Sequence, residues 1–223
     1  RWAHNPEVVG SNPAPATRKG IDVSKSVTTQ INIKHKNRNR ATVFWRGILA
    51  FPVIIFVGTF AQSSFSESEN WAAGTAGLIV IPTVLALLFR GKYPSYVLTF
   101  NHALIELSTR LAAYLLILSD KYPSIEASSK VSVVFPDVDG GKKLKRWLPL
   151  VKWFLAIPHY IVGAIYLVIS LVVTVIAWVQ TSITGKYPRW AGEIVFGTIS
   201  YWNRVQGYML LLVTDKYPSF RLK

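Results

Sequence analysis

Long apolar stretches alternate with short basic or polar segments along this chain. Residues 44–60 and 72–89 are almost free of charge, and a polar, acidic segment, 61–70, separates them. A third apolar stretch covers residues 148–183. Because about 20 apolar residues are needed to cross the hydrocarbon core of a membrane, the first two stretches predict a transmembrane hairpin.

The third stretch, 148–183, contains no polar loop and no turn residues beyond Pro158 and Gly163. One straight helix of this length would be about 54 Å long at a rise of 1.5 Å per residue, well beyond the hydrocarbon thickness of roughly 30 Å. The stretch is therefore a hairpin or a kinked helix. Similarity to the first two stretches favours the hairpin, whereas the missing turn signal favours the kinked helix; we expect the hairpin.

Two further segments, 97–118 and 191–213, each carry a narrow polar stripe on an otherwise apolar helix. Each stripe has an arginine near its middle, Arg110 in the first and Arg204 in the second. An arginine at mid-membrane costs roughly 2.5–3.5 kcal/mol on insertion scales, so we expect both helices to lie flat in the membrane interface. A polar stripe packed inside a helical bundle is the alternative.

Two short segments alternate in the way that β-strands do, SVTTQINI from Ser26 and KVSVVFPDV from Lys130. Each strand alone would have an unpaired edge, so we expect the two to pair with each other. The predicted fold is an all-α integral membrane protein with two repeats. Each repeat has a transmembrane hairpin or kinked helix and an amphipathic interfacial helix, and the short β-strands are cytoplasmic.

The repeats are two copies of one unit, residues 21–126 and 127–223. The tripeptide Lys-Tyr-Pro occurs four times and flanks both amphipathic segments, after Gly on entry and after Asp on exit. Aligned on these tripeptides with one inserted residue, the copies match at Arg110 and Arg204, at Tyr114 and Tyr208, and at the LA-x-P motifs that begin at Leu49 and Leu155.

Each Lys-Tyr-Pro is expected to mark a bend of the chain at the cytoplasmic membrane interface. Tyr and Lys favour the headgroup level, where an amphipathic ring and a snorkelling cation both fit. Pro ends a helix, and the Gly before it permits a tight exit from the preceding helix. The predicted anchors are Lys92, Tyr93, Lys121, Tyr122, Lys186, Tyr187, Lys216 and Tyr217.

Charge is scarce and unevenly placed: 16% of the residues are charged, the formal net charge is +14, and 51% of the residues are hydrophobic. Basic residues precede the apolar stretches, whereas segment 61–70 contains Glu67 and Glu69 but no Lys or Arg. By the positive-inside rule, both termini are cytoplasmic and this segment is external in a multi-pass protein. The same rule accounts for the basic residues, so no nucleic-acid partner is expected.

Catalytic motifs are missing from the sequence. It has no phosphate-binding glycine loop, no G-x-S-x-G and no dinucleotide fingerprint. His102 and Glu106 are four residues apart on one helix face, but two ligands are too few for a metal site. Because cysteine is absent, disulfides and thiolate sites are excluded too. We therefore expect no enzyme, no metal and no cofactor.

Lipid binding is the function that these residues favour, at the cytoplasmic face of the membrane. Basic side chains beside apolar helices attract anionic headgroups, and the candidate residues are Arg110, Arg204, Lys142, Lys143, Lys145 and Arg146. We expect a non-enzymatic scaffold or lipid-interacting protein whose partners are the bilayer, its anionic lipids, and a second copy or a membrane complex. Duplicated halves make a small transporter or channel subunit the alternative.

Three motifs follow one another in the second copy: LAIPHYIVG from Leu155, TGKYPRW from Thr184 and TDKYPSF from Thr214. In this order they resemble the bacterial domain-of-unknown-function family 4389, over nearly all of the second copy and more loosely over the first. Trp190 replaces the usual Gly of that family. The resemblance implies a membrane protein of a prokaryotic cytoplasmic membrane and no established biochemical activity.

Residues 1–20 stand apart from both copies. They contain no apolar core and no cleavage site, so they are not a signal peptide. The stretch VVGSNPAPAT reads like a translated transfer RNA gene. We expect this tail to be a gene-calling artefact or a disordered extension.

Overall fold

The computed structural model describes residues 26–61, 79–126 and 130–222. The predicted tail, 1–20, and nearly all of the acidic segment, 61–70, lie outside the described residues. The elements are β1 (Thr28–Ile31), α1 (Arg40–Leu49), α2 (Phe51–Ala61), α3 (Ile81–Leu85), the π-helix η3 (Ala86–Arg90), α4 (Ser95–Leu115), β2 (Val131–Val134), the 3-10 helix η4 (Asp139–Gly141), α5 (Leu148–Leu155), α6 (Ile157–Thr184) and α7 (Arg189–Met209).

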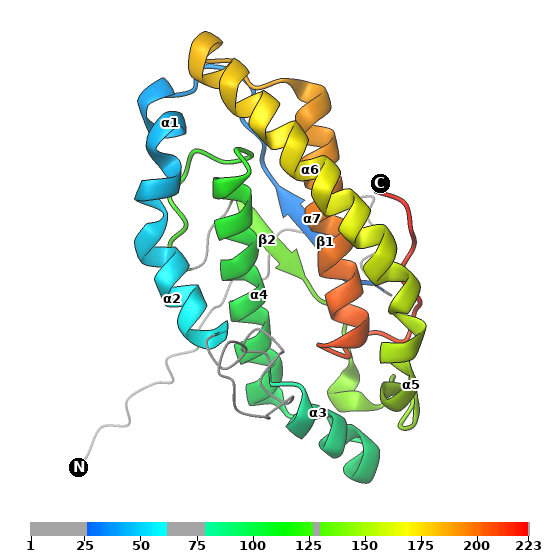
Figure 1. Cartoon of the computed structure of the whole chain (residues 1–223). Helices are drawn as coiled ribbons and strands as arrows, with labels where there is room; N and C mark the ends of the chain where they lie inside the picture. Colours follow the sequence, from blue (N-terminus) through cyan, green and yellow to red (C-terminus); the bar gives the residue numbers. More distant parts are fainter. Residues whose placement is uncertain (1–25, 62–78, 127–129, 223) are drawn as a thin grey trace, which may run out of the picture.

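The described elements form three layers, a mostly helical arrangement with one small sheet (Figure 1). α1–α2 and α5–α6 make the outer layer, α4 and α7 make the inner layer, and the sheet packs on the other side of α4 and α7. α4 and α7 run in opposite directions, so the two Gly-Lys-Tyr-Pro turns before them lie at opposite ends of the molecule. One face of the protein is therefore helical, and the opposite face carries the strands.

Apolar stretch 148–183 is a kinked helix, and the expected hairpin is wrong. α5 ends at Leu155 and α6 begins at Ile157, while Ala156 between them keeps helical dihedral angles (φ −82°, ψ −9°). Pro158 is the second residue of α6, and because a proline ring removes one helical hydrogen bond, the helix bends there. α6 alone has 28 residues and is about 42 Å long.

The first copy has the same bend in its outer helix. Ala50 lies between α1 and α2 with φ −77° and ψ −12°, and Pro52 follows it. Ala50 belongs to the same buried apolar cluster as Tyr114, and Ala156 at the matching position belongs to the same cluster as Tyr208. Both alanines are fully buried, so each LA-x-P motif marks a bend where a small side chain lets the outer helix approach the inner one.

The second expected span, 72–89, is described only from residue 79 onward. Its described part is a helix of ten residues, Ile81–Arg90, about 15 Å long and too short to cross a membrane. It lies near the first turns of α4 and away from α1 (Figure 1). The described residues therefore do not form the transmembrane hairpin that the sequence predicts.

The two amphipathic helices lie inside the protein. Gly197, Ser200 and Asn203 from the polar stripe of α7 are buried, and so are Thr109 and Arg110 from the stripe of α4. Asn203 Nδ2 donates to Thr109 Oγ1 at 3.1 Å, so the two stripes meet. The structure thus has the bundle alternative, and the expectation that the polar stripes of these helices face the membrane interface is wrong.

The predicted pairing of the two strands is confirmed. β1 and β2 are antiparallel, with Thr29 opposite Val133. α4 covers the outer edge of β2: Val133 N–H donates to Glu106 Oε1 at 3.1 Å, and its carbonyl lies 2.6 Å from His102 Nε2. The His102 and Glu106 side chains, four residues apart on one helix face, therefore close a sheet edge.

Gly163 of α6 gives a test of the packing between outer and inner helices. A Cβ atom at this position would lie 2.7 Å from Cζ2 of Trp202 on α7. We expect Gly163→Ala to lower the free energy of unfolding by about 1–3 kcal/mol, as overpacking does. Circular dichroism during thermal unfolding in detergent measures the change.

Gly58→Ala in α2 is the matched control. A Cβ there meets nothing within 4 Å, and Ala favours a helix over Gly by roughly 0.5–1 kcal/mol, so stability should stay equal or rise. An equal loss for both variants would contradict the packing described here.

Candidate functional site

α6 exposes apolar side chains along its whole length, which is the reverse of a helix in a water-soluble protein. Its buried side chains form one narrow stripe toward α7, made mostly of small or polar residues: His159, Gly163, Ser170, Val173, Ala177 and Thr181. The rest of its circumference is apolar. Ile161, Val168 and Val175, which share one face at a spacing of seven residues, are 64%, 60% and 61% exposed. Leu171 and Val172 on other faces are 49% and 55% exposed.

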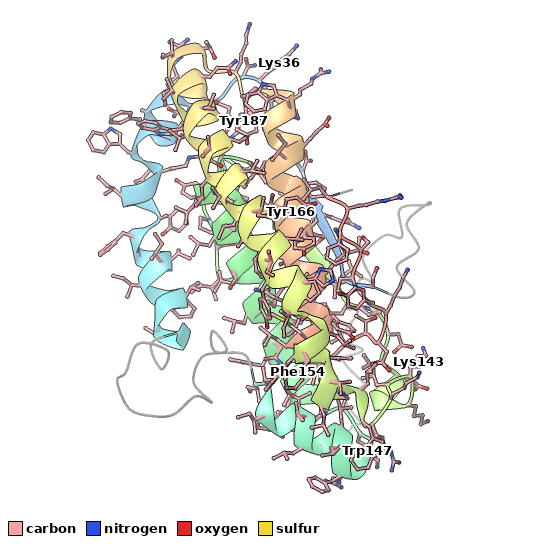
Figure 2. All side chains as sticks on the ribbon, turned by 45° about the vertical axis from the view of Figure 1, so that its right-hand side comes forward. Lys36, Lys143, Trp147, Phe154, Tyr166 and Tyr187 are labelled. Carbon is pink, nitrogen blue, oxygen red and sulfur yellow. The ribbon has the colours of Figure 1, made fainter. Side chains whose placement is uncertain are left out.

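α1, α2 and α5 continue the same exposed face (Figure 2). We call the whole of it the apolar surface: Phe44, Trp45, Ile48, Leu49, Phe51, Ile54, Ile55, Phe56, Trp147, Leu150, Val151, Trp153, Phe154, Leu155, Ile157, Tyr160, Ile161, Ile165, Leu167, Val168, Ile169, Leu171, Val172, Val175, Ile176, Val179 and Ile183. Single exposed apolar residues are ordinary, but so many on the helices of one layer mark a binding face.

Basic side chains lie at both ends of the apolar surface. Lys36 and Lys143 are at opposite ends of the molecule in Figure 2. Of the predicted cluster, Lys142, Lys143, Lys145 and Arg146 are all exposed. Lys143 pairs with exposed Asp137 at 2.5 Å. Cationic side chains beside apolar ones are the arrangement that attracts anionic headgroups.

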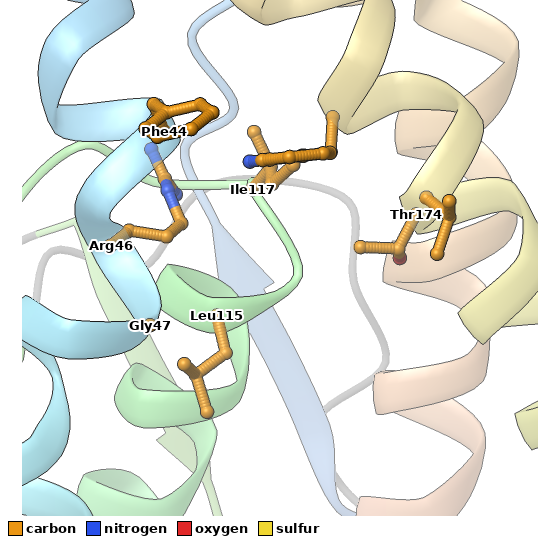
Figure 3. Close-up of a pocket in the computed structure, with 8 residues that line it drawn as sticks. Phe44, Arg46, Gly47, Leu115, Ile117 and Thr174 are labelled. Carbon is orange, nitrogen blue, oxygen red and sulfur yellow. The ribbon is translucent and has the colours of Figure 1, made fainter.

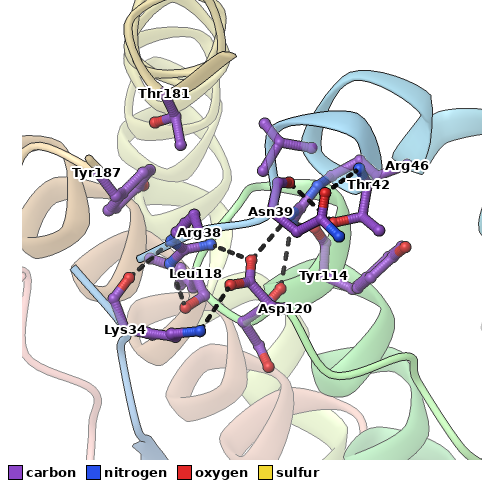
Figure 4. A network of polar contacts seen from close by, with 12 residues as sticks. Lys34, Arg38, Asn39, Thr42, Arg46, Tyr114, Leu118, Asp120, Thr181 and Tyr187 are labelled. Carbon is purple, nitrogen blue, oxygen red and sulfur yellow. Dashed lines mark hydrogen bonds and ion pairs between the residues drawn. The ribbon is translucent and has the colours of Figure 1, made fainter. Parts of the chain in front are cut away.

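Beneath the apolar surface, Asp120 binds a group of buried cations (Figure 4). Its Oδ1 lies 2.8 Å from Arg38 Nη1 and 3.2 Å from Arg46 Nη2. The carbonyls of Leu118 and Ser119 accept from the same two arginines at 3.0 and 3.1 Å. Burial lowers the pKa of Arg38, and the negative charge of Asp120 opposes that shift.

The second copy has a corresponding ion pair at matching positions. Lys152 Nζ lies 2.8 Å from Asp215 Oδ1 and donates to the Thr214 carbonyl at 2.7 Å. It lies 5.0 Å from the centre of the Tyr208 ring, and Arg46 lies 4.8 Å from that of Tyr114. The Asp of each Asp-Lys-Tyr-Pro therefore neutralises a cation on the preceding outer helix.

Sequence reasoning missed these pairs. Arg46 and Lys152 are isolated charges in apolar helices, and each lies four residues before the alanine of the LA-x-P bend. An isolated charge of this kind needs a partner. The two recurring aspartates, Asp120 and Asp215, were the available signal.

The tyrosines of the two Gly-Lys-Tyr-Pro turns lie inside the protein. Tyr93 and Tyr187 are 5% and 3% exposed, so their rings pack against the protein itself. Tyr93 donates to the Leu211 carbonyl at 2.6 Å, and Tyr187 donates to that of Leu116 at 3.5 Å. Burial raises the pKa of both tyrosines to about 12, so both stay neutral at physiological pH.

The other predicted anchors lie on the surface. Tyr122 and Tyr217 are 46% and 41% exposed. The four lysines of the Lys-Tyr-Pro turns, Lys92, Lys121, Lys186 and Lys216, are also exposed.

Arg110 and Arg204 bind the chain segments that follow their own helices. Arg110 is buried, lies 3.4 Å from Glu106, and donates to the carbonyls of Ser124 and Glu126. Arg204 donates to the Arg221 carbonyl at 2.6 Å. Because both arginines donate to carbonyls of the protein itself, the recurrence of the two arginines has a structural reason.

A pocket of about 300 Å³ opens between α1, the end of α4 and α6 (Figure 3). Phe44 and Trp178 stack at its edge with ring centroids 5.5 Å apart. Leu115 and Ile117 line it together with Arg46. Within the described residues no group of three His, Asp or Glu side chains could hold a metal ion. The lining suits apolar groups.

Two helices of the described residues are long and apolar enough to cross a membrane: Arg40–Thr59, which includes the bend at Ala50, and Ile157–Thr184. The chain is a mostly helical protein with two candidate membrane helices. Residues 147–221 match the family model described as Domain of unknown function (DUF4389), which supports the resemblance over that region. No curated protein and no solved structure matches the chain.

The buried pair of Lys152 and Asp215 gives a stability prediction. Their side chains are 1% and 19% exposed, and Asp215→Asn removes the charge that neutralises the buried lysine. We expect a loss of about 3–5 kcal/mol in the free energy of unfolding. Adding Lys152→Met should restore most of it, since an apolar side chain of similar size replaces the cation.

Asp137→Asn is the matched control, because Asp137 and Lys143 form an exposed pair. It should leave the free energy of unfolding nearly unchanged, because exposed ion pairs contribute little to stability. Thermal unfolding in detergent compares the three variants. Equal effects of Asp137→Asn and Asp215→Asn would show that the buried pair stabilises the protein no more than the exposed pair does.

Arg110 gives a second prediction, about local order. Arg110→Gln removes the donors to the carbonyls of Ser124 and Glu126, and hydrogen bonds to a charged group contribute about 1.5–3 kcal/mol. We expect faster hydrogen exchange in residues 119–126, measured by mass spectrometry. Arg189→Gln, at the exposed first residue of α7, is the control and should leave that exchange unchanged. An unchanged exchange rate in the Arg110 variant would show that Arg110 does not hold residues 119–126 in place.

Proposed function

We propose that this protein is a non-enzymatic membrane protein that binds lipid through the apolar surface and acts as a scaffold or lipid-interacting protein at the cytoplasmic face. One observation carries the proposal: apart from its buried stripe, α6 exposes apolar side chains from Ile157 to Ile183, along almost all of its 28 residues. In water, roughly 25 cal/mol is lost for each Å² of apolar surface left exposed. Lipid removes that penalty.

The basic ends of the apolar surface support anionic lipid as the partner. Lys36 lies at one end and Lys143 at the other (Figure 2), where each can reach headgroups beside the embedded helices. Each Lys or Arg near an anionic surface contributes about 1 kcal/mol. By the positive-inside rule, both termini lie on the cytoplasmic side, and the family resemblance implies a prokaryotic cytoplasmic membrane.

The proposal includes a tandem duplication. The matching ion pairs at Asp120 and Asp215 support it, as do the matching bends at Ala50 and Ala156. Arginines at equivalent positions also bind carbonyls at equivalent positions, because Glu126 and Arg221 each lie six residues after the aspartate of their turn. Both copies then contribute one outer helix to the apolar surface.

Lysines placed on the apolar surface test the proposal. We expect the triple change of Ile161, Val168 and Val175 to Lys to abolish flotation with anionic liposomes, because a charge in hydrocarbon costs roughly 2.5–3.5 kcal/mol. The matched control puts three lysines on the sheet, at Thr28, Gln30 and Ser132, and should float as the unchanged protein does. Circular dichroism in detergent verifies that both variants are folded.

Two results would contradict the proposal. One is flotation of the α6 variant at the level of the unchanged protein. The other is an unchanged protein that stays in solution without detergent as a defined oligomer, since a second copy of the chain would then cover the apolar surface.

A further inference from the structure

We infer that the apolar surface lies within a single leaflet, with α6 parallel to the membrane plane, and that α6 does not cross the bilayer. This inference rests on the proposed function. At about 42 Å, α6 is long enough to cross the hydrocarbon core, so its own composition allows either orientation. What lies beside it decides between them.

The position of the sheet is the first reason. β1 and β2 lie beside the middle of the inner helices, where β2 binds His102 and Glu106 of α4 (Figure 1). If α6 crossed the membrane, the bundle axis would be the membrane normal and the sheet would lie at mid-membrane. α4 closes the outer edge of β2, but the irregular segments that follow the strands, 32–35 and 135–138, would then lie at membrane depth, where lipid-exposed irregular backbone does not occur.

Polar and charged groups near the same level give the second reason. Gln30 and Ser132 lie half-buried on the strands. Arg110 binds the irregular segment around Ser124 and Glu126, which leaves the end of α4 and returns along its side. Lipid-exposed irregular backbone is not tolerated at membrane depth. With α6 in the membrane plane, the sheet and these groups face water.

Charge gives the third reason. The basic ends marked by Lys36 and Lys143 lie at opposite ends of the long axis (Figure 2). A crossing helix would put a basic cluster on each side of the membrane, whereas Lys and Arg collect on the cytoplasmic side. In the membrane plane, both ends lie at the headgroup level of the same leaflet.

Depth agrees with this orientation. A helix with its side chains is about 10–12 Å across, and helices that lie in the interface bury their apolar face about 5–10 Å deep. The outer layer of α1–α2 and α5–α6 is one helix thick. It therefore fits within one leaflet, with α4 and α7 above it and the sheet farthest from the lipid.

Spin labels along α6 test the inference, and the chain has no native cysteine to interfere. Single cysteines replace Ile161, Val168 and Val175 in turn, and each carries a nitroxide label in liposomes. The ratio of the label's accessibility to oxygen and to a water-soluble nickel complex measures its depth in the membrane. We expect all three labels at one depth within the hydrocarbon. A crossing helix would make Val168 the deepest, with Ile161 shallower by about 10 Å from seven residues at 1.5 Å each.

The outcomes separate this inference from the proposed function. A graded depth profile overturns the single-leaflet orientation and leaves membrane binding intact. Labels that are all open to the aqueous nickel complex overturn both.

Sidedness gives an independent measurement. Lys36→Cys and Lys143→Cys should react with a membrane-impermeant maleimide from the same side of oriented vesicles. Reaction from opposite sides would overturn the inference even if the depth profile were flat.

Discussion

A cation on an otherwise apolar helix has to be neutralised where it lies, and this constraint organises the protein. Lys152 is almost completely buried, and Asp215 binds it at 2.8 Å. Removing charge from water costs several kcal/mol for each ion unless a partner is at hand. The partner, Asp215, lies just after the end of α7, so the ion pair fixes the end of α7 against α5. Asp120 does the same for α4 and α1, with Arg46 as the cation.

The turns that deliver these aspartates have left-handed backbones. Ile117 after α4 has φ 64°, and Leu212 after α7 has φ 57°. Bulky side chains rarely adopt this conformation, and both of these are fully buried. Tertiary packing and the ion pair that follows hold the strained residue in place, so the turn, the packing and the charge pair depend on one another.

The local patterns in the sequence predicted local structure well. Alternation over β1 and β2, and the need of each strand for a partner, gave the correct pairing. The absence of a turn signal around Pro158 was correct evidence for a kinked helix, and the analogy with the first copy wrongly outweighed it. Side-chain chemistry alone was insufficient for Arg110, because its partners at Ser124 and Glu126 are backbone carbonyls. Every residue has a backbone carbonyl, so the residue types do not reveal which carbonyls accept these hydrogen bonds.

Contacts between the two halves were equally invisible in the sequence. Tyr93 binds a carbonyl at the end of α7, and Tyr187 binds one at the end of α4. Each half therefore supplies a ring that closes the helix end of the other half. A repeated motif predicted the similarity of the halves. It did not predict that the halves exchange these tyrosine contacts.

In the single-leaflet orientation that we propose, a helical layer on one face of the protein has a mechanical consequence for the membrane. Such a layer adds area to one leaflet and none to the other. Because the two leaflets of a closed vesicle stay in contact, they cannot relieve this difference in area by separating. The bilayer then bends toward the leaflet without protein, and a surface that is already curved accommodates the layer at a lower elastic energy. Because α6 has 28 residues, the inserted layer is long in one direction. The bending that it favours is therefore cylindrical rather than spherical.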